Sequence, residues 1–174
     1  MLGNPEHKPL LNGQLPWTRG CLVCGKHNPR GFRLRARIEN GSVVLDYVTQ
    51  PHDAGYTHIV HGGIAMTLLD EVMTWAAIVA TGQMCVTAEI TTRLVRPMDV
   101  GAKLRIAARV TRNARRLVLT VARVIDEQGQ ILSEASGKYV PVPPDKASLH
   151  SKDFVHGSDT IPINKILQAG GTPR

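Results

Sequence analysis

Aromatic side chains are scarce in this sequence. Only 4% of the 174 residues are aromatic, namely two Phe, two Trp and three Tyr, and none lies between Trp75 and Tyr139. A hydrophobic core must therefore be built from Val, Leu, Ile, Ala and Met. Because proteins bind single-stranded nucleic acids largely by stacking bases on aromatic rings, the shortage argues against a nucleic-acid partner.

Cysteine and uninterrupted apolar runs are also rare. Three cysteines are too few for the disulfide framework of a small secreted protein, and their number is odd. The longest apolar stretch, residues 64–80, contains two Thr and two acidic residues, which argues against a membrane span. Residues 1–17 contain three prolines and lack the apolar run of a signal peptide. We therefore expect a cytoplasmic protein without a membrane partner.

Two of the cysteines, Cys21 and Cys24, have the C-x-x-C spacing of a zinc ligand pair, and His27 lies nearby. A structural zinc site usually has four ligands from two such pairs, and the sequence has no second pair. A redox role is also disfavoured, because the pair does not stand between a strand and a helix. We therefore expect no metal and no cofactor, with the two cysteines as small buried residues of an N-terminal turn.

Positive charge is concentrated in one stretch. The formal net charge is +7, and residues 101–125 hold seven basic and no acidic side chains. Six of the seven are Arg, whose planar guanidinium suits phosphate oxygens. A run of like charge is also typical of a solvated surface. The stretch therefore indicates an anionic partner without identifying it.

Hydrophobic periodicity predicts one domain of mixed structure. Alternating apolar residues predict strands on both sides of a turn at Asn40-Gly41, and a nearly all-round apolar pattern predicts a buried helix over residues 64–80. The predicted strands are 32–38, 43–47, 85–96, 103–111, 115–126 and 130–140. This order fits an α+β fold in which a largely antiparallel sheet wraps one long helix. We divide the chain into an irregular segment (1–31), this domain (32–143) and a C-terminal extension (144–174), which contains a short helical pattern near 164–167 and is disordered or docked on a partner subunit.

The helix carries two features that require an explanation. Gly62 and Gly63 stand where it begins, and Asp70 and Glu71 stand in its middle. Unpaired N–H groups at a helix start, with no side chains in the way, are suited to bind a carbonyl oxygen on which negative charge develops. A carboxylate in an apolar helix is costly unless it is paired or functional. An exposed polar stripe at an interface remains the structural alternative.

In this constellation the sequence resembles hotdog-fold acyl-CoA thioesterases of the phenylacetate-pathway type, a branch similar to the human thioesterase-superfamily members. The resemblance covers about residues 21–143, and its fold is a long helix wrapped by an antiparallel sheet. It rests on four segments: Ile59-Val60-His61-Gly62-Gly63, Leu68-Leu69-Asp70-Glu71, Cys21-Leu-Val-Cys24-Gly25 with Asn28-Pro29-Arg30-Gly31, and Arg96-Pro97 with Gly101. One departure is Thr57-His58, where many relatives have Pro-Gly.

The resemblance implies a role for each matching residue. Asp70 is expected to be the catalytic carboxylate, as general base on water or as nucleophile, and the Gly62 N–H is expected to polarise the thioester carbonyl. His61 is expected to shape the loop, and Thr87 to position water. The family's sites lie between two subunits, so a homodimer or homotetramer is implied.

Further residues are predicted to bind the substrate, although most of them lie outside the His61-Gly62-Gly63 and Asp70 motif. We expect Gly63, Met66 and Met73 at the acyl group, and Arg93, Arg96, Arg112, Arg115 and Arg116 at the phosphates of coenzyme A. The leading hypothesis is hydrolysis of an acyl-CoA thioester to the free acid and CoA. The alternative is a non-catalytic hotdog domain that binds an acyl-CoA or a similar ligand, since fold does not fix function. A hotdog hydratase or dehydratase is disfavoured, because the sequence has no good match to the His and acid pairing on which such enzymes usually rely.

Overall fold

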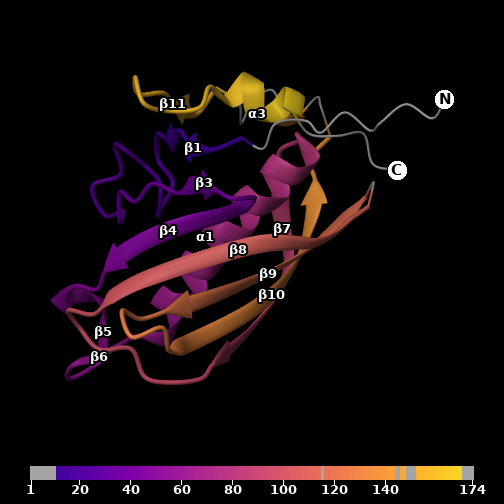
Figure 1. Ribbon diagram of the computed structural model, residues 1–174. Coiled ribbons are helices and arrows are strands. Elements are labelled where there is room, and N and C mark those ends of the chain that lie inside the picture. Colours follow the sequence, from indigo (N-terminus) through magenta and orange to yellow (C-terminus); the bar gives the residue numbers. More distant parts are fainter. Residues whose placement is uncertain (1–10, 115, 144–145, 148–151, 170–174) are drawn as a thin grey trace.

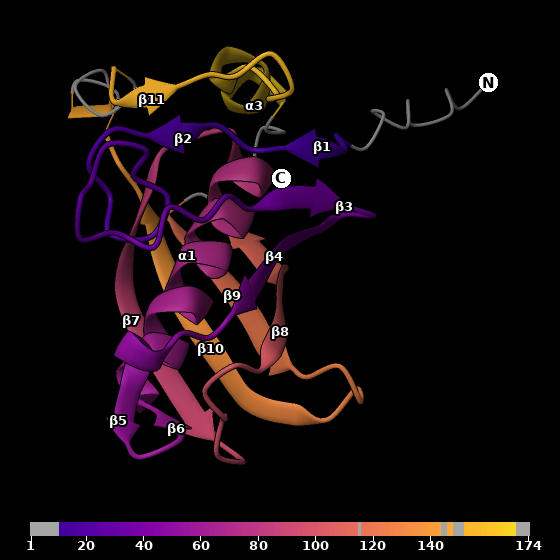
Figure 2. The ribbon, with the colours of Figure 1, turned by 90° about the vertical axis from the view of Figure 1, so that its left-hand side faces the viewer.

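The computed structural model describes residues 11–114, 116–143, 146–147 and 152–169. A long helix, α1 (Gly62–Thr81), lies across one face of a large antiparallel sheet, as Figures 1 and 2 show. The described sheet has seven strands in the order β1-β3-β4-β8-β9-β10-β7. Their bounds are β1 (Gly13–Gln14), β3 (Arg37–Glu39), β4 (Ser42–Val48), β7 (Cys85–Leu94), β8 (Lys103–Ala114), β9 (Leu117–Ile125) and β10 (Ile131–Pro141).

The sequence pattern of α1 explains how the helix packs on the sheet. Side chains at spacings of three and four residues, such as Ala65, Leu68, Leu69, Val72 and Met73, are buried against the sheet. The helix ends at Gly82, whose φ of +66° is the left-handed conformation that glycine adopts easily, and whose N–H donates to the Ile78 carbonyl. By length and composition alone α1 also passes as a membrane span, but a buried core helix passes the same test.

This arrangement confirms the predicted α+β hotdog fold. The turn at Asn40-Gly41 has positive φ at both residues (+50° and +79°), as a tight hairpin turn requires. The helix and the four strands after it lie where the periodicity places them. The helix begins two residues earlier than predicted, because both glycines belong to its first turn.

One predicted strand is largely wrong. Residues 32–38 alternate as a strand would, but only Arg37–Glu39 pair in the sheet. Arg33 has φ +53°, which breaks an extended run. The N–H groups of Phe32 and Leu34 donate instead to the carbonyls of Leu22 and Val23. The backbone of this segment is therefore hydrogen-bonded to the N-terminal loop, while the apolar side chains of Phe32, Leu34 and Ala36 still pack in or against the core.

The two ends of the described chain form a layer of their own near the C-terminal half of α1 (Figure 2). The short strand β2 (Trp17–Thr18) pairs with β11 (Phe154–Val155), and the short helix α3 (Ile163–Ala169) packs on α1. Ile166 of α3 is fully buried. The part of the C-terminal extension that is described thus docks on the N-terminal segment and on α1 of the same chain.

The loop between β4 and α1 holds the remaining short elements. A single 3-10 turn, η1 (Pro51–Asp53), is followed by the two-stranded ribbon of β5 (Ala54–Tyr56) and β6 (Ile59–Val60). His58, between these strands, has φ +67°, a left-handed conformation that costs a non-glycine residue about 1–2 kcal/mol. The Thr57-His58 departure noted in the sequence therefore coincides with a strained backbone position.

Candidate functional site

The carboxylate of Asp70 is fixed by two hydroxyl groups from the sheet. Thr87 of β7 and Tyr139 of β10 both donate to its Oδ1, at 2.8 Å and 2.9 Å. Its Oδ2 accepts no hydrogen bond from any described residue. One oxygen is thus held in place while the other is available to take a proton or to attack a carbonyl carbon.

A β-bulge brings both hydroxyl groups to Asp70. In the β7–β10 pairing, Lys138 lies opposite Glu89 but Tyr139 lies opposite Thr87, so Ala88 is an extra residue. A bulge reverses which residues of a strand face the helix. In a regular strand Thr87 and Ile90, which are three residues apart, would face opposite sides of the sheet. Because of the bulge, Thr87 points toward α1 and Ile90 also packs against the core.

Tyr139 is a permanent donor in this site. Its side chain is fully buried, and burial together with the neighbouring Asp70 carboxylate raises the pKa of its phenol well above the usual range. The ring lies against Gly137, where an added Cβ would come within 2.5 Å of the tyrosine Cε2. Gly137 therefore leaves the space in which Tyr139 reaches Asp70.

The start of α1 presents a free N–H group. His61 is the N-cap: its Nδ1 accepts from the Gly63 N–H at 2.9 Å, and its carbonyl accepts from Ile64. Gly62 N–H has no acceptor among the described residues. Helix starts leave N–H groups unpaired and carry partial positive charge, so this group is suited to a developing oxyanion.

A hollow of about 650 Å³ opens beside this free N–H. It is bordered by the ribbon β5–β6, by the helix start and by the chain after β7, with Tyr56, Gly62, Leu94, Arg96 and Ser133 among its lining residues. Leu94 lies so close to Gly62 that a Cβ there would meet its Cδ1 at 2.7 Å. Ser133 is buried and its hydroxyl has no partner among the described residues. Asp70 does not line this hollow.

The loop that leads into the helix is anchored by Asp53. This buried carboxylate accepts from the Tyr47 hydroxyl and, at 2.7 Å, from the Gln50 N–H, while the Asp53 carbonyl accepts from the His61 N–H. Burial and the Asp53 carboxylate raise the pKa of Tyr47 well above its usual range. The position of His61 and Gly62 therefore depends on a residue outside the conspicuous motif.

We expect Asp53→Ala to destabilise the protein by about 2–4 kcal/mol, because it leaves the Tyr47 hydroxyl and the Gln50 N–H without their acceptor. Denaturant unfolding measures the change. His52→Ala is the control, since its side chain is 77% exposed and its loss should change stability by less than about 0.5 kcal/mol. Equal stability of Asp53→Ala and the wild type would contradict the anchoring role.

The two halves of the predicted site are separated within one chain. Gly62 and Asp70 are eight residues apart on α1, which corresponds to about 12 Å along the helix axis and about 80° around it. One reacting carbonyl would have to lie about 3 Å from both groups. A single copy of the chain therefore does not bring the Gly62 N–H and the Asp70 carboxylate to the same thioester.

The predicted acyl-binding residues lie at different depths. Met66 is 42% exposed on α1, whereas Met73 is fully buried in the core. Gly63 leaves room for the capping imidazole, since a Cβ there would meet His61 Nδ1 at 2.9 Å.

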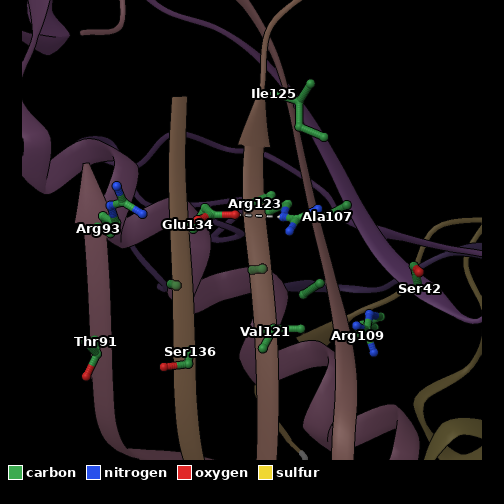
Figure 3. A pocket seen from close by; sticks show the side chains of 13 residues that line it. Ser42, Thr91, Arg93, Ala107, Arg109, Val121, Arg123, Ile125, Glu134 and Ser136 are labelled. Carbon is green, nitrogen blue, oxygen red and sulfur yellow. Dashed lines mark hydrogen bonds and ion pairs between the residues drawn. The ribbon is translucent and has the colours of Figure 1, made fainter. Parts of the chain in front are cut away.

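The predicted phosphate-binding arginines are dispersed. Arg93 lines a hollow of about 550 Å³ on the sheet face away from α1, together with Arg109 and Arg123 (Figure 3). Arg96 lines the hollow beside Gly62 and donates to the Ile131 carbonyl. Arg112 and Arg116 are exposed around the β8–β9 turn. This turn lies near the C-terminal end of α1, as the hydrogen bond from the Asn113 side chain to the Ala80 carbonyl shows. Arg115 lies outside the described residues.

Part of the basic stretch is neutralised by neighbouring strands. Lys103 pairs with Glu127, Arg105 with Glu39 and Asp46, and Arg123 with Glu134. Arg109, Arg112 and Arg116 have no carboxylate within 4 Å among the described residues. Only part of the charge concentration seen in the sequence is therefore free to attract an anion.

Glu71, the second carboxylate of the helix, faces a different environment from Asp70. Its Oε1 accepts from Trp75 Nε1 at 3.0 Å, and its Oε2 lies 3.7 Å from Cys21 Sγ. One ligand atom from each of Cys21, Cys24 and Glu71 lies within 4.8 Å of the others. Burial raises the pKa of Glu71 to about 7. Hydrogen bonds from the Cys24 thiol and from backbone N–H groups lower the pKa of Cys21 to about 5.

Local sequence patterns identify neither Tyr139 nor Asp53 as site residues, and they do not give the partners of Glu71. Tyr139 ends the long aromatic-free stretch and stands two residues after a strand glycine, but neither signal points to Asp70. Asp53 lies in a loop without a recognisable pattern, and the sequence indicates no partner for Glu71. Each depends on a contact between segments far apart in the sequence, which a local pattern does not contain.

Comparison with known proteins places these features in context. The model of the thioesterase superfamily matches residues 57–133. No curated protein sequence matches the chain.

Solved structures resemble the described fold. The smu.793 protein of Streptococcus mutans, solved with acetyl-CoA, is 22% identical, with a TM-score of 0.57 over 60% of this chain and 84% of that one. The E. coli PaaI protein of the phenylacetic acid degradation operon is 19% identical, with a TM-score of 0.56 over 60% and 75% of the two chains. An acyl-CoA hydrolase of Staphylococcus aureus, in complex with butyryl-CoA and CoA, is 19% identical, with a TM-score of 0.57 over 60% and 65%.

Proposed function

We propose that this chain hydrolyses an acyl-CoA thioester. It is a hotdog-fold protein that resembles the thioesterase superfamily in sequence over residues 57–133 and solved structures such as PaaI in fold over 60% of its length. The observation that carries the proposal is the Asp70 carboxylate, with Oδ1 held by Thr87 and Tyr139 and Oδ2 free. The products are a carboxylic acid and free CoA.

The proposed reaction uses Asp70 Oδ2 and the Gly62 N–H on opposite sides of the thioester. Oδ2 either removes a proton from a water molecule that attacks the carbonyl carbon, or attacks that carbon itself. The carbonyl oxygen becomes negatively charged and is stabilised by the Gly62 N–H at the positive end of α1. The C–S bond then breaks, and the CoA sulfur leaves and takes up a proton. Where Asp70 itself attacks, this leaves an acyl–Asp70 anhydride, which a water molecule then hydrolyses to the carboxylic acid and the free Asp70 carboxylate.

A second copy of this chain is needed to complete such a site. Because Gly62 and Asp70 lie about 12 Å apart on one helix, we propose that Asp70 of one copy acts with Gly62 of another. The edge strand β7 is the proposed contact: it ends the described sheet order and pairs there only with β10. An unpaired edge of ten residues is a template for another strand.

Exposed apolar side chains support a contact along β7. Val86 and Leu94 of β7 are 51% and 49% exposed, and Met66 on the adjacent helix is 42% exposed. Large exposed apolar groups beside an unpaired strand are typical of an interface. The proposed dimer would cover them and would bring Thr87, which is exposed in one chain, into an enclosed site.

The acyl-CoA class is supported by similar proteins and by the hollow beside Gly62. Two of the similar structures were solved with acetyl-CoA and butyryl-CoA. The hollow of about 650 Å³ offers apolar walls from Ile59, Val60 and Leu94 next to the free N–H. We propose that the acyl group lies there, with Arg96 at its border.

The direct test is a hydrolysis screen over short, medium, long-chain and aryl acyl-CoAs, with Asp70→Ala as the blank. Product acid and CoA are quantified by mass spectrometry. Turnover of at least one class by the wild type and none by the blank supports hydrolysis. Binding of acyl-CoA by calorimetry without turnover would favour the non-catalytic binding domain instead.

The arginines at the β8–β9 turn give a separate prediction. We expect Arg112→Ala and Arg116→Ala each to raise KM for acyl-CoA by about 3–10-fold with little change in kcat, because each loses about 1 kcal/mol of attraction to phosphate. The dependence of KM on salt should weaken as well. Arg123→Ala is the control, since Arg123 is already paired with Glu134. Unchanged KM and salt dependence would make the cluster a solvated surface.

A further inference from the structure

A group of three potential metal ligands lies outside the proposed catalytic site. Cys21 and Cys24 come from the N-terminal segment and Glu71 comes from the middle of α1, with one ligand atom of each within 4.8 Å of the others. The sequence argued against zinc because a second Cys pair is missing. The fold supplies a third ligand from a segment fifty residues away.

The backbone around the cysteines forms a tight turn with an N–H group directed at the Cys21 sulfur. The Val23 N–H points at Cys21 Sγ at 3.3 Å, and the Gly25 N–H closes the turn on the Cys21 carbonyl at 3.0 Å. Gly25 is required here, because a Cβ would lie 2.1 Å from that carbonyl oxygen. Backbone N–H groups directed at a sulfur stabilise its thiolate form, which is the form that binds metal.

The carboxylate of Glu71 is oriented toward the two sulfurs. Trp75 Nε1 holds Oε1, which leaves Oε2 on the side of Cys21 Sγ. A partner that fixes the other end of a ligand is typical of metal sites. The Thr18 hydroxyl adds a contact of 3.5 Å to Cys24 Sγ on the far side of the turn.

Charge balance also favours a cation. Glu71 is partly buried, and among the described residues it has no Lys, Arg or His within 4 Å. Two sulfurs and a carboxylate that lie this close together without a basic partner have no counter-charge should more than one of them ionise. A divalent ion supplies that counter-charge directly.

We propose that Cys21, Cys24 and Glu71 bind one Zn²⁺, with a water molecule in the fourth position. Zinc is favoured because its usual ligands are thiolate and carboxylate in tetrahedral geometry. A tetrahedral zinc with Zn–S bonds of about 2.3 Å places neighbouring ligand atoms about 3.5–3.8 Å apart, so a small inward rotation of the side chains completes the site. The ion would tie the N-terminal segment to α1, one residue from Asp70, without touching the reacting atoms.

The test is zinc content and zinc affinity of the full-length, tag-free protein purified under reducing conditions. After chelation and readdition of Zn²⁺, we expect about one zinc per chain, measured by elemental analysis and by competition with a chromophoric chelator. Cys21→Ser and Cys24→Ser should weaken binding by at least about 100-fold, and Glu71→Gln by at least about 10-fold. Co²⁺ in place of Zn²⁺ should give a sulfur-to-metal charge-transfer band in the wild type and in Cys85→Ser, but not in Cys21→Ser or Cys24→Ser.

Cys85→Ser is the matched control, because Cys85 is also buried but contacts only Thr81 and Gln83 among the hydrogen-bonding groups described. It should keep wild-type zinc affinity. Zinc should raise the Tm of the wild type and of Cys85→Ser, and leave that of Cys24→Ser unchanged, which separates binding from misfolding. Absence of binding by the reduced wild type, or wild-type affinity in Glu71→Gln, would overturn the proposal. None of these measurements uses acyl-CoA, so they are independent of the proposed hydrolysis.

Discussion

Replacing Asp70 by Asn should lower kcat for acyl-CoA hydrolysis by at least about 10³-fold, while the protein stays folded. The amide keeps the shape of the carboxylate, and its oxygen still accepts from Thr87 and Tyr139. It has neither the basicity to activate water nor the nucleophilicity to attack a thioester. General-base and nucleophilic roles contribute on the order of 10²–10⁴-fold or more. Steady-state kinetics and thermal unfolding measure the two quantities.

Glu89→Gln is the matched control for Asp70→Asn. Glu89 lies on the same strand as Thr87, but its carboxylate pairs with Lys138 at 2.9 Å and is exposed. We expect its kcat to stay within about 3-fold of the wild type, since exposed ion pairs contribute little. If Asp70→Asn retained wild-type turnover, Asp70 would not be the catalytic carboxylate.

Replacing Gly62 by Pro should lower kcat by about 10²–10³-fold, because proline has no N–H for the oxyanion. The backbone tolerates the change: Gly62 is the first residue of α1, where proline is favoured, and His61 has ψ 131°, as a residue before proline requires. Helix α1 loses no hydrogen bond, since the Gly62 N–H has no acceptor in the described part of the chain. The loss should therefore appear in kcat.

Gly62→Ala controls for the added side chain. It carries the same Cβ toward Leu94 Cδ1, at 2.7 Å, but keeps the N–H. Both variants are compared in a Leu94→Ala background, which removes the close contact. We expect Ala to retain kcat within about 10-fold and Pro to fall about 10²-fold below Ala. Equal activity of the two variants would mean that the Gly62 N–H does not stabilise the transition state.

Sequence patterns predict the parts of this fold that repeat regularly. The helix is found because apolar residues occupy nearly all of its faces, and the strands β8, β9 and β10 are found because their side chains alternate. The failure at residues 32–36 has a physical reason. Leu34 and Ala36 pack on the core as they would in a strand. The N–H groups of Phe32 and Leu34, however, donate to the 21–24 loop and not to a neighbouring strand, and side-chain periodicity does not reveal where backbone hydrogen bonds go.

The candidate site was predictable where one segment carries it. His61 caps α1, and Gly62 and Asp70 lie on it, so the spacing of these residues is visible in the sequence. Tyr139 was not predictable, since its contact with Asp70 spans 69 residues and depends on a bulge at Ala88. Glu71 was recognised as a carboxylate, but its partners Cys21 and Trp75 required the fold.

Mixing two inactive variants tests the shared site most directly. In a dimer of one Asp70→Asn chain and one Gly62→Pro chain, one site carries both defects and the other carries an intact Asp70 and an intact Gly62 N–H. After unfolding and refolding an equimolar mixture, half of the dimers are mixed, so activity should return to about a quarter of the wild type. If each site were formed within one chain, the mixture would stay as inactive as its components, and the account of a site shared between two copies would be wrong.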